Sequence, residues 1–352
     1  MATTRGPRLD AETFYAGLGD FQVEPLWKHP GLLPKQPESK AVPHLWRYSQ
    51  LRELLTQAGD LVDPEEAERR VLMLMNPGLE GRAAATTNLY AGLQLVLPGE
   101  VAPAHRHAAS ALRFVVEGSG AYTTVDGERQ VMRPGDLVLT PNWASHEHGN
   151  ETDEPMIWLD GLDLPIINGL EANFFDRSGE RPKEPTKHDN ASARMYSTAR
   201  LNPAWLTWQH DYSPVYNYPW GQTERLLEDI AEDTSGSSTD GIILEYTNPY
   251  TGGPVLPSLG CYIQSLAGGL QTSAHRHTTS AVYHVVRGRG TTIVDGQRLE
   301  WQEHDTFAVP GWAIHEHANG SAQDPAVLFS FTDDPVLRAL GYYRAELCER
   351  QG

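Results

Sequence analysis

The sequence predicts an all-β protein built from two tandem jelly-roll β-barrels, with short helices on their flanks. The first reason is an internal repeat, because AHRHAASALRFVVEG at 104–118 returns as AHRHTTSAVYHVVRG at 274–288. Further along, NWASHEHGN at 142–150 returns as GWAIHEHAN at 311–319. The second reason is that each copy alternates short runs of branched and aromatic residues, such as LRFVVEG and DLVLTP, with Gly, Pro and Asp-Gly turns. Many short strands with frequent turns favour a barrel or sandwich, so we expect two copies of one β-domain.

The repeats divide the chain into consecutive parts. We expect an N-terminal extension with helices over residues 1–84, a first barrel over 85–170, a linker or arm over 171–240, a second barrel over 241–335 and a C-terminal tail over 336–352.

Two helices are expected outside the barrels. The first is EEAERRVLMLM at 65–75, because Asp63 and Pro64 supply an N-cap and a proline at the first helical position, and Asn-Pro-Gly follows at 76–78. The second is TERLLEDIAED at 223–233, followed by the polar run TSGSSTDG at 234–241, which we expect to form a mobile loop.

Composition narrows the class of protein. The 352 residues carry 28 Lys and Arg against 46 Asp and Glu, a net charge of −18, which disfavours binding to nucleic acid or to an anionic membrane surface. The polar N-terminus lacks a signal-peptide core, and no apolar run approaches the roughly 18 residues of a membrane span. Cys261 and Cys348 are too few for a disulfide framework. We therefore expect a soluble cytoplasmic protein.

Eight of the fourteen histidines lie in the repeated segments, four in each copy. They are His105, His107, His146 and His148, then His275, His277, His315 and His317. Residues i and i+2 of a strand face the same side, so His105 and His107 point together into the barrel while Arg106 points out. Imidazole suits first-row divalent metals, and a recurrence of the spacing disfavours ordinary core histidines.

These motifs resemble those of the cupin family. The first copy has Gly99, His105, His107 and Gly118, then Gly135, Pro141, His146 and Asn150. The second has Gly269, His275, His277, Gly288, Pro310, His315 and Asn319, and it departs at His304, which stands in the place of Gly135. The resemblance implies a bicupin over about residues 85–335.

A typical cupin adds a glutamate ligand four residues after the second histidine, where this chain has Ala111 and Ala281. Three neutral histidines leave up to three positions of an octahedron open, enough for a chelating substrate and dioxygen. Together with EPLWKHPGLLP at 24–34 and YAGLQLVLPGEVAPAHRH at 90–107, this pattern is similar to the gentisate 1,2-dioxygenase family, with salicylate and 1-hydroxy-2-naphthoate dioxygenases nearly as close.

The resemblance implies a cofactor, substrates and an assembly. It implies Fe(II) on His105, His107 and His146, with a possible second site on His275, His277 and His315. The substrates would be a small aromatic hydroxy acid and O2, and gentisate would be opened between its carboxyl- and hydroxyl-bearing carbons to give maleylpyruvate. A homo-oligomer, a tetramer in many relatives, is expected.

Strand alternation predicts what lines the first cavity. Arg113 shares its face with Ala111, so its guanidinium should point inward and bind a substrate carboxylate, or else pair with Asp160 or a glutamate. Tyr90, Gly92 and Gln94 share one strand face, and a strand glycine often marks close approach of a ligand.

Three further residues complete the expected cavity. Arg69, on the first expected helix, would reach over the cavity mouth or else face solvent. Asp160, and His148 beside the metal, are the catalytic candidates, and His148 is either an acid/base group or a structural histidine. The resemblance implies that Arg69, Gln94, Arg113, His148 and Asp160 match pocket positions of the family.

The second copy keeps the histidines but not this lining. Applying the repeat offset places Tyr262 at Gly92, Tyr283 at Arg113 and Phe329 at Asp160. We therefore expect catalysis in the N-terminal barrel, and metal bound weakly or only structurally in the C-terminal one. Two other classes stay open: a noncatalytic bicupin that binds a small anion, and a zinc sugar-phosphate isomerase, which the missing glutamate disfavours.

Overall fold

The structure is a computed structural model that describes residues 10–63, 69–177, 185–197 and 201–349. It separates into a small N-terminal unit, which ends at Glu38, and a body that begins at Ser39. The N-terminal unit contains α1 (Ala11–Leu18) and three short 3-10 turns, η1 (Gly19–Phe21), η2 (Leu26–Lys28) and η3 (Pro30–Leu32). Asp10 caps α1 by accepting the backbone N–H of Thr13 at 2.8 Å.

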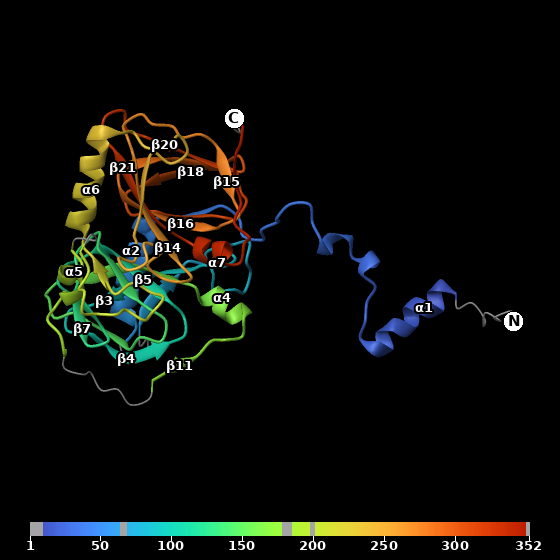
Figure 1. Cartoon of the computed structure of the whole chain (residues 1–352), viewed down its shortest axis with the longest axis horizontal. Helices are drawn as coiled ribbons and strands as arrows, with labels where there is room; N and C mark the ends of the chain where they lie inside the picture. The colour runs from blue at the N-terminus through green and yellow to red at the C-terminus, as the bar shows by residue number, and fades with distance from the viewer. Residues whose placement is uncertain (1–9, 64–68, 178–184, 198–200, 350–352) are drawn as a thin grey trace. The chain divides into compact units, whose positions relative to one another are not determined.

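The body consists of two jelly-roll barrels, each made of a six-stranded and a five-stranded antiparallel sheet (Figure 1). The first barrel comprises β2 (Arg70–Met73), β3 (Tyr90–Val96), β4 (Val101–His107), β5 (Ala111–Glu117), β6 (Tyr122–Val125), β7 (Glu128–Val131), β8 (Leu137–Thr140), β9 (His146–Gly149), β10 (Met156–Leu162), β11 (Phe175–Asp176) and β12 (Asn217–Tyr218). The second barrel comprises β1 (His44–Trp46), β13 (Ile242–Glu245), β14 (Gly260–Leu266), β15 (His275–His277), β16 (Ala281–Arg287), β17 (Arg289–Val294), β18 (Gln297–Gln302), β19 (Thr306–Val309), β20 (His315–Asn319), β21 (Ala326–Thr332) and β22 (Ala345–Leu347). The predicted all-β bicupin architecture is confirmed.

The two large sheets have the same strand order, β12-β8-β5-β10-β3-β2 in the first barrel and β1-β19-β16-β21-β14-β13 in the second. The edge strand β1 comes from before the first barrel, yet it pairs with β19 of the second. The edge strand β12 comes from the linker and pairs with β8 of the first. The segments outside the repeats therefore complete the sheets and hold the two barrels in one body.

The first helix expected from the sequence is wrong where the structure describes it. Residues 70–73 form β2, which pairs with β3 so that Arg70 lies opposite Leu95 and Met73 opposite Gly92. Residues 64–68 of that expected helix lie outside the described residues. Pairing with a buried strand outweighs the local capping signals.

The remaining helices lie between or after the barrel strands. They are α2 (Tyr48–Leu61), α4 (Leu164–Gly169), α5 (Ala191–Met195), α6 (Trp220–Asp233) and α7 (Asp334–Ala339). The expected helix at 223–233 is confirmed by α6, which touches both barrels (Figure 1): the Trp220 N–H donates to Asp136 of the first, and Glu224 pairs with Arg287 of the second. The sequence analysis missed α2, which buries Leu55 against β2 and β3.

Strand alternation sorts the residues of β5 between two cores. Leu112, Phe114 and Val116 belong to the core between the barrels, where the Phe114 ring stacks on Phe329 with centroids 4.2 Å apart. Val115, on the opposite face, packs with Trp158 inside the first barrel. This alternation leaves the Arg113 side chain inside the first barrel.

The departure of the second copy at His304 leaves the backbone unchanged. His304 has a φ of +68°, in the left-handed region, and Gly135 in the first copy has a φ of +85°. Glycine is also required at position 135 of the first copy because space is short there: a Cβ would lie 2.6 Å from the Trp220 ring of α6.

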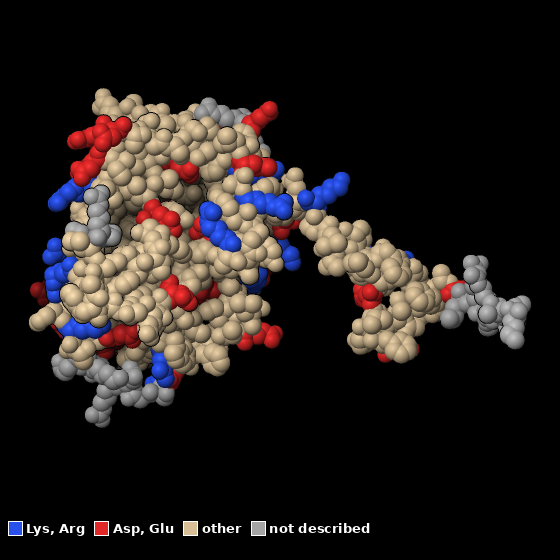
Figure 2. All heavy atoms as spheres, viewed as in Figure 1, with Lys and Arg blue, Asp and Glu red and all other residues tan. Residues whose placement is uncertain are grey.

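The described surface carries both signs of charge. Figure 2 shows Lys and Arg side chains interspersed with Asp and Glu on the visible face of the body. Among the described residues, the helices are all too short or too polar to cross a membrane.

Candidate metal centre

Three histidines of the first barrel meet at one point. His105 and His107 come from β4 and His146 from the neighbouring β9, where His105 and His146 are paired in register. One ring nitrogen of each lies within 4.8 Å of those of the other two. Arg106, between the first two, points outward and forms an ion pair with Asp176 at 2.7 Å. The period-two prediction for these residues therefore holds in the structure.

The protonation of these histidines is fixed by the backbone. The Nδ1 atoms of His105, His107 and His146 lie 3.1, 2.7 and 2.9 Å from the carbonyl oxygens of Pro103, Ala109 and Ala144. A carbonyl can only accept, so Nδ1 keeps the proton and Nε2 keeps a lone pair.

The resulting set of nitrogens fits a divalent metal ion. The Nε2 atom of His146 is buried without a hydrogen-bond partner, as expected of a metal ligand. Burial lowers the pKa of His105 to about 3 and that of His107 to about 4, so both rings are neutral at pH 7. Three neutral imidazoles suit a first-row divalent ion and leave its charge uncompensated by the protein ligands.

Arg113 lies within the barrel and is 4% exposed. One terminal nitrogen donates to the Thr140 hydroxyl at 2.6 Å and the other to His148 Nε2 at 3.0 Å. Its Nε is 3.5 Å from the Asp160 carboxylate and makes no hydrogen bond. The ion pair that the sequence left open therefore exists, although it engages one edge of the guanidinium only.

His148 is held between Arg113 and Thr123. Because Arg113 donates to Nε2, the ring proton sits on Nδ1, which donates to the Thr123 hydroxyl at 2.9 Å. The residue is fully buried, and burial lowers its pKa well below the usual histidine value. In this arrangement His148 accepts a hydrogen bond from Arg113 and orients it. Thr123 and Thr140 were missed from the sequence, because only cross-strand register brings them to this cluster.

Asp160, Gly92 and Arg113 form one row across the sheet. In β10, Asp160 lies opposite Arg113 of β5 and opposite Gly92 of β3, so the three share a face. The Trp158 indole donates to the Asp160 carboxylate at 3.0 Å. Burial raises the pKa of Asp160 to about 6, although Arg113 opposes that rise.

The third strand supplies the remaining predicted residues. Gln94 is buried opposite Trp158, on the same face as Gly92. The Tyr90 hydroxyl lies 2.9 Å from where a Cβ of residue 92 would stand, so glycine is needed there for the tyrosine to reach over the strand. Burial raises the pKa of Tyr90, so its hydroxyl is neutral and can donate.

Arg69 lies at a bend directly before β2, and it is not on a helix. Its guanidinium lies against the His105 ring, with one terminal nitrogen 2.5 Å from Nδ1 and 2.6 Å from Nε2. The structure thus places Arg69 against His105, from the segment before β2 and not from the predicted helix. A guanidinium and a metal ion compete for the lone pair of the same ring, so the two cannot occupy this position together.

Comparison with known proteins agrees with this geometry. The cupin-domain family matches residues 92–162 and 262–332. Gentisate 1,2-dioxygenase 1 of Aquipseudomonas alcaligenes is 41% identical over 347 residues, covering 98% of this chain and 99% of that protein. The 5-aminosalicylate 1,2-dioxygenase of a Comamonas species is 41% identical over 344 residues, covering 96% and 91%. The chain belongs to the gentisate 1,2-dioxygenase family.

A solved member of this family has the same fold throughout. The salicylate 1,2-dioxygenase of Pseudoaminobacter salicylatoxidans, in a crystal structure with gentisate, superposes with a TM-score of 0.89 at 35% identity. The match covers 99% of this chain and 98% of that one. Membership of a dioxygenase family, together with the two groups of three histidines in this chain, points to a metal cofactor.

One equivalence expected for the second barrel of this family member is wrong. Tyr283 lies opposite Ser330, and so does Tyr262, so Ser330 and not Phe329 stands in the place of Asp160. The turn before β21 is one residue longer than its counterpart, which restores the original offset, and a shift of one residue reverses the face of a strand. Phe329 accordingly faces Phe114 of the other barrel.

Because several of its histidines are buried and neutral, we expect acid to lower the unfolding free energy of the metal-free protein. His105, His107, His284 and His317 have pKa values lowered by burial to about 3 or 4, so between pH 7.5 and 5.5 they take up protons only when unfolded. Each should cost up to about 1.4 kcal/mol of unfolding free energy over that interval. Asp160, with its pKa raised to about 6, works in the opposite direction but by less.

The measurement is urea unfolding of the chelator-treated protein at pH 7.5 and 5.5. We expect the unfolding free energy to fall at the lower pH, and to fall less for His107→Gln. A metal-free protein equally stable at both values contradicts neutral, buried histidines.

Proposed function

We propose that the N-terminal barrel cleaves the aromatic ring of gentisate with dioxygen, using Fe(II) on His105, His107 and His146. The observation that carries this proposal is that one barrel holds both a group of three neutral histidines and a buried arginine, Arg113. Family members that act on gentisate by name support the choice of substrate. Fe(II) bound there would offer open coordination positions for the substrate and dioxygen, and the electrons that reduce dioxygen would come from the ring that is cleaved. The product expected from gentisate is maleylpyruvate.

The charges of the cavity favour an anionic substrate. Among the described side chains that reach it, Arg69 and Arg113 are cationic and Asp160 is the single carboxylate in contact with Arg113. Because the histidines bring no charge, the bound metal ion adds to this positive potential. A carboxylate with an adjacent phenolate oxygen is a chelating group of the opposite charge, so an ortho-hydroxy acid matches both the metal and the arginines.

Arg113 is prepared to hold the substrate in one orientation. Thr140 and His148 occupy one N–H of each terminal nitrogen, which fixes the plane of the guanidinium and leaves further N–H groups to bind a carboxylate. Since the group is already buried and ordered, little conformational entropy is lost when the substrate binds. Arg69, which comes from the segment before β2, can follow the carboxylate over the cavity.

The same cavity offers partners for a second ring hydroxyl. Tyr90 has a neutral hydroxyl, and the Asp160 carboxyl group lies in the adjacent row opposite Gly92. With its pKa raised to about 6, Asp160 can accept a proton from a bound hydroxyl more readily than an exposed aspartate. These groups favour gentisate, whose 5-hydroxyl needs a buried partner, over acids with a single hydroxyl.

The direct test is oxygen consumption by Fe(II)-loaded protein offered gentisate, salicylate or 1-hydroxy-2-naphthoate separately. We expect uptake to be fastest with gentisate, with one O2 consumed per ring. Uptake that favours the mono-hydroxy acids contradicts the choice of substrate but keeps the reaction. Iron-loaded protein that consumes no oxygen with any of them contradicts the dioxygenase proposal and leaves an anion-binding bicupin.

Replacing Arg113 by methionine tests the anion clamp. The variant removes a buried charge that pairs with the substrate, so we expect gentisate to bind at least about thirtyfold more weakly, or about 2 kcal/mol. The iron content should be unchanged, because Arg113 is not a ligand. Arg106→Met is the matched control, since Arg106 lies on the outer face and pairs with Asp176. Equal gentisate affinity in Arg113→Met and the unsubstituted chain contradicts the clamp.

We also propose that the protein is a homo-oligomer, a tetramer. The N-terminal unit does not cover its own large apolar side chains, which include Phe21, Trp27 and Leu33, and α1 buries none of its residues within the unit. Apolar surface of this kind is typical of a segment that packs on another chain. Light scattering should give a mass near 4 × 39.0 = 156 kDa. A chain lacking residues 1–38 should form particles with fewer than four chains. Particles that still contain four shortened chains contradict a role for this unit.

A further inference from the structure

The second barrel contains a cavity of about 430 Å³ whose lining includes His275 and His277. These residues of β15 and His315 of β20 bring their ring nitrogens within 4.8 Å of one another. Their Nδ1 atoms lie 3.2, 2.9 and 3.0 Å from the carbonyl oxygens of Ser273, Thr279 and Ala313. Nε2 therefore carries the lone pair in each ring, as in the first barrel.

One of these lone pairs has no partner in the protein. His315 is 1% exposed, and its Nε2 makes no hydrogen bond. A buried, unprotonated ring nitrogen that faces two others of the same kind is costly unless a cation binds there. The geometry is thus that of a metal centre.

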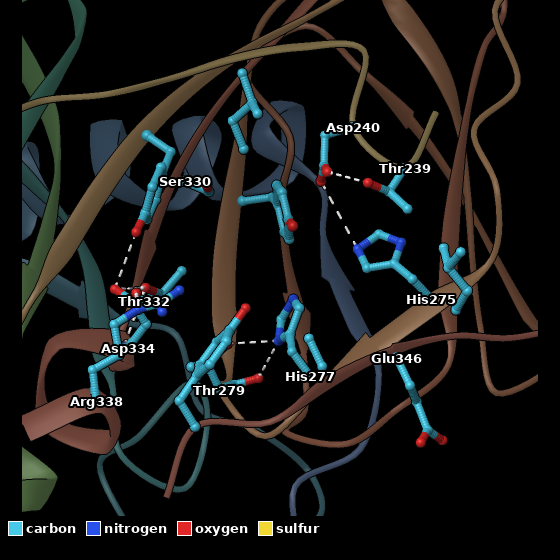
Figure 3. A pocket seen from close by; sticks show the side chains of 16 residues that line it. Thr239, Asp240, His275, His277, Thr279, Ser330, Thr332, Asp334, Arg338 and Glu346 are labelled. Atoms are coloured by element: carbon cyan, nitrogen blue, oxygen red, sulfur yellow. Dashed lines mark hydrogen bonds and ion pairs between the residues drawn. The ribbon is translucent and has the colours of Figure 1, made fainter. Parts of the chain in front are cut away.

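A carboxylate from another part of the chain completes the group. Figure 3 shows Asp240 turned toward His275, and its Oδ1 lies 3.8 Å from His275 Nε2. The other oxygen, Oδ2, accepts hydrogen bonds from the hydroxyls of Ser237 at 3.1 Å and Thr239 at 2.5 Å. One oxygen is therefore held by the loop, and the other is directed toward His275, at the edge of the group of three histidines.

The loop that carries Asp240 is fastened to the second barrel. Its Ser237 and Gly241 exchange backbone hydrogen bonds, at 2.7 and 2.9 Å. The Ser238 carbonyl accepts the N–H of Ser273, just before the histidine strand, and the Asp240 carbonyl accepts the side-chain amide of Gln264. The segment that the sequence suggested as a mobile loop is thus tied to the barrel at several points, and these ties place Asp240 beside His275.

The first barrel has the opposite charge in the corresponding place. Met73 of β2 lies opposite Gly92, and Glu245 of β13 lies opposite Tyr262, the counterpart of Gly92. The segments just before β2 and β13 are therefore equivalent, with Arg69 at the place of Gly241 and Asp240 one residue earlier. In the first barrel this segment directs the guanidinium of Arg69 at His105, whereas in the second it directs the carboxylate of Asp240 at His275.

The rest of the second cavity does not suit an organic acid. Tyr283 stands in the place of Arg113 and Tyr262 in the place of Gly92, so the anion clamp is absent and bulk replaces open space. The arginine that lines this cavity, Arg338, already pairs with Asp334 at 2.6 Å. The cavity thus attracts a cation and repels an anionic substrate.

We propose that the C-terminal barrel binds a divalent first-row metal ion through His275, His277, His315 and the Asp240 carboxylate. Four protein ligands of this kind form a closed, four-coordinate site of the type that zinc occupies structurally. The carboxylate supplies from the linker loop what Ala281 cannot supply from the strand. The ion fastens that loop to the barrel and takes no part in binding the substrate. This inference does not depend on the reaction proposed for the first barrel.

The experiment measures zinc binding in a chain whose first site is disabled by His146→Ala. After dialysis against zinc and then buffer, elemental analysis should find two ions per unsubstituted chain, one in His146→Ala and none when His315→Ala is added. Asp240→Asn in the His146→Ala chain should weaken zinc binding at least about tenfold in competition with a chromophoric chelator. It should also reduce the rise in Tm that zinc produces.

Glu346→Gln is the matched control, because Glu346 lines the same cavity but is already paired with Arg276. It should leave zinc affinity unchanged. If His315→Ala does not fold, His275→Gln provides the same comparison. Absence of zinc from folded His146→Ala overturns the second metal site. An Asp240→Asn chain that binds zinc as tightly as its parent overturns the fourth ligand.

Discussion

The hydrogen bond from a histidine Nδ1 to a backbone carbonyl two residues away is the constraint on which both sites depend. It occurs at all six clustered histidines, and in each it forces the lone pair of Nε2 toward the centre of the barrel. Because the partner is backbone, the arrangement follows from the path of two strands and survives changes in the surrounding side chains. In the first barrel burial also lowers the pKa of His105 to about 3 and that of His107 to about 4, so these rings stay neutral, as a metal ion requires.

A few charged side chains around the histidines decide which kind of ligand each barrel can bind. The first barrel surrounds the histidines with Arg69 and Arg113, so a ligand must bring negative charge. The second presents Asp240 and replaces the buried arginine by Tyr283, so the protein itself brings the negative charge. On our proposals, one fold accommodates a site open to substrate and a site closed by its own chain.

Much of this could be predicted from the sequence, because the repeat and the two-residue period of a strand act together. The inward direction of His105, His107 and Arg113 follows from alternation alone, and the duplicated spacing made a metal site the best interpretation of the histidines. The all-β bicupin fold followed from the same repeat.

The predictions from sequence were wrong where strand pairing or strand register determines the structure. Local capping signals suggested a helix that includes residues 70–73, but their pairing with β3 makes them a strand. One additional residue in a turn exchanged Phe329 for Ser330 at the position of Asp160. Asp240 and Thr123 gave no signal, since each reaches its histidine from a different element of the fold.

The most direct test of this division of labour compares His105→Ala with His275→Ala, both supplied with Fe(II) and gentisate, by the initial rate of oxygen uptake. Our account predicts that His105→Ala loses turnover while folded, whereas His275→Ala retains most of it. Loss of turnover in folded His275→Ala, with turnover preserved in His105→Ala, would contradict the assignment of catalysis to the N-terminal barrel.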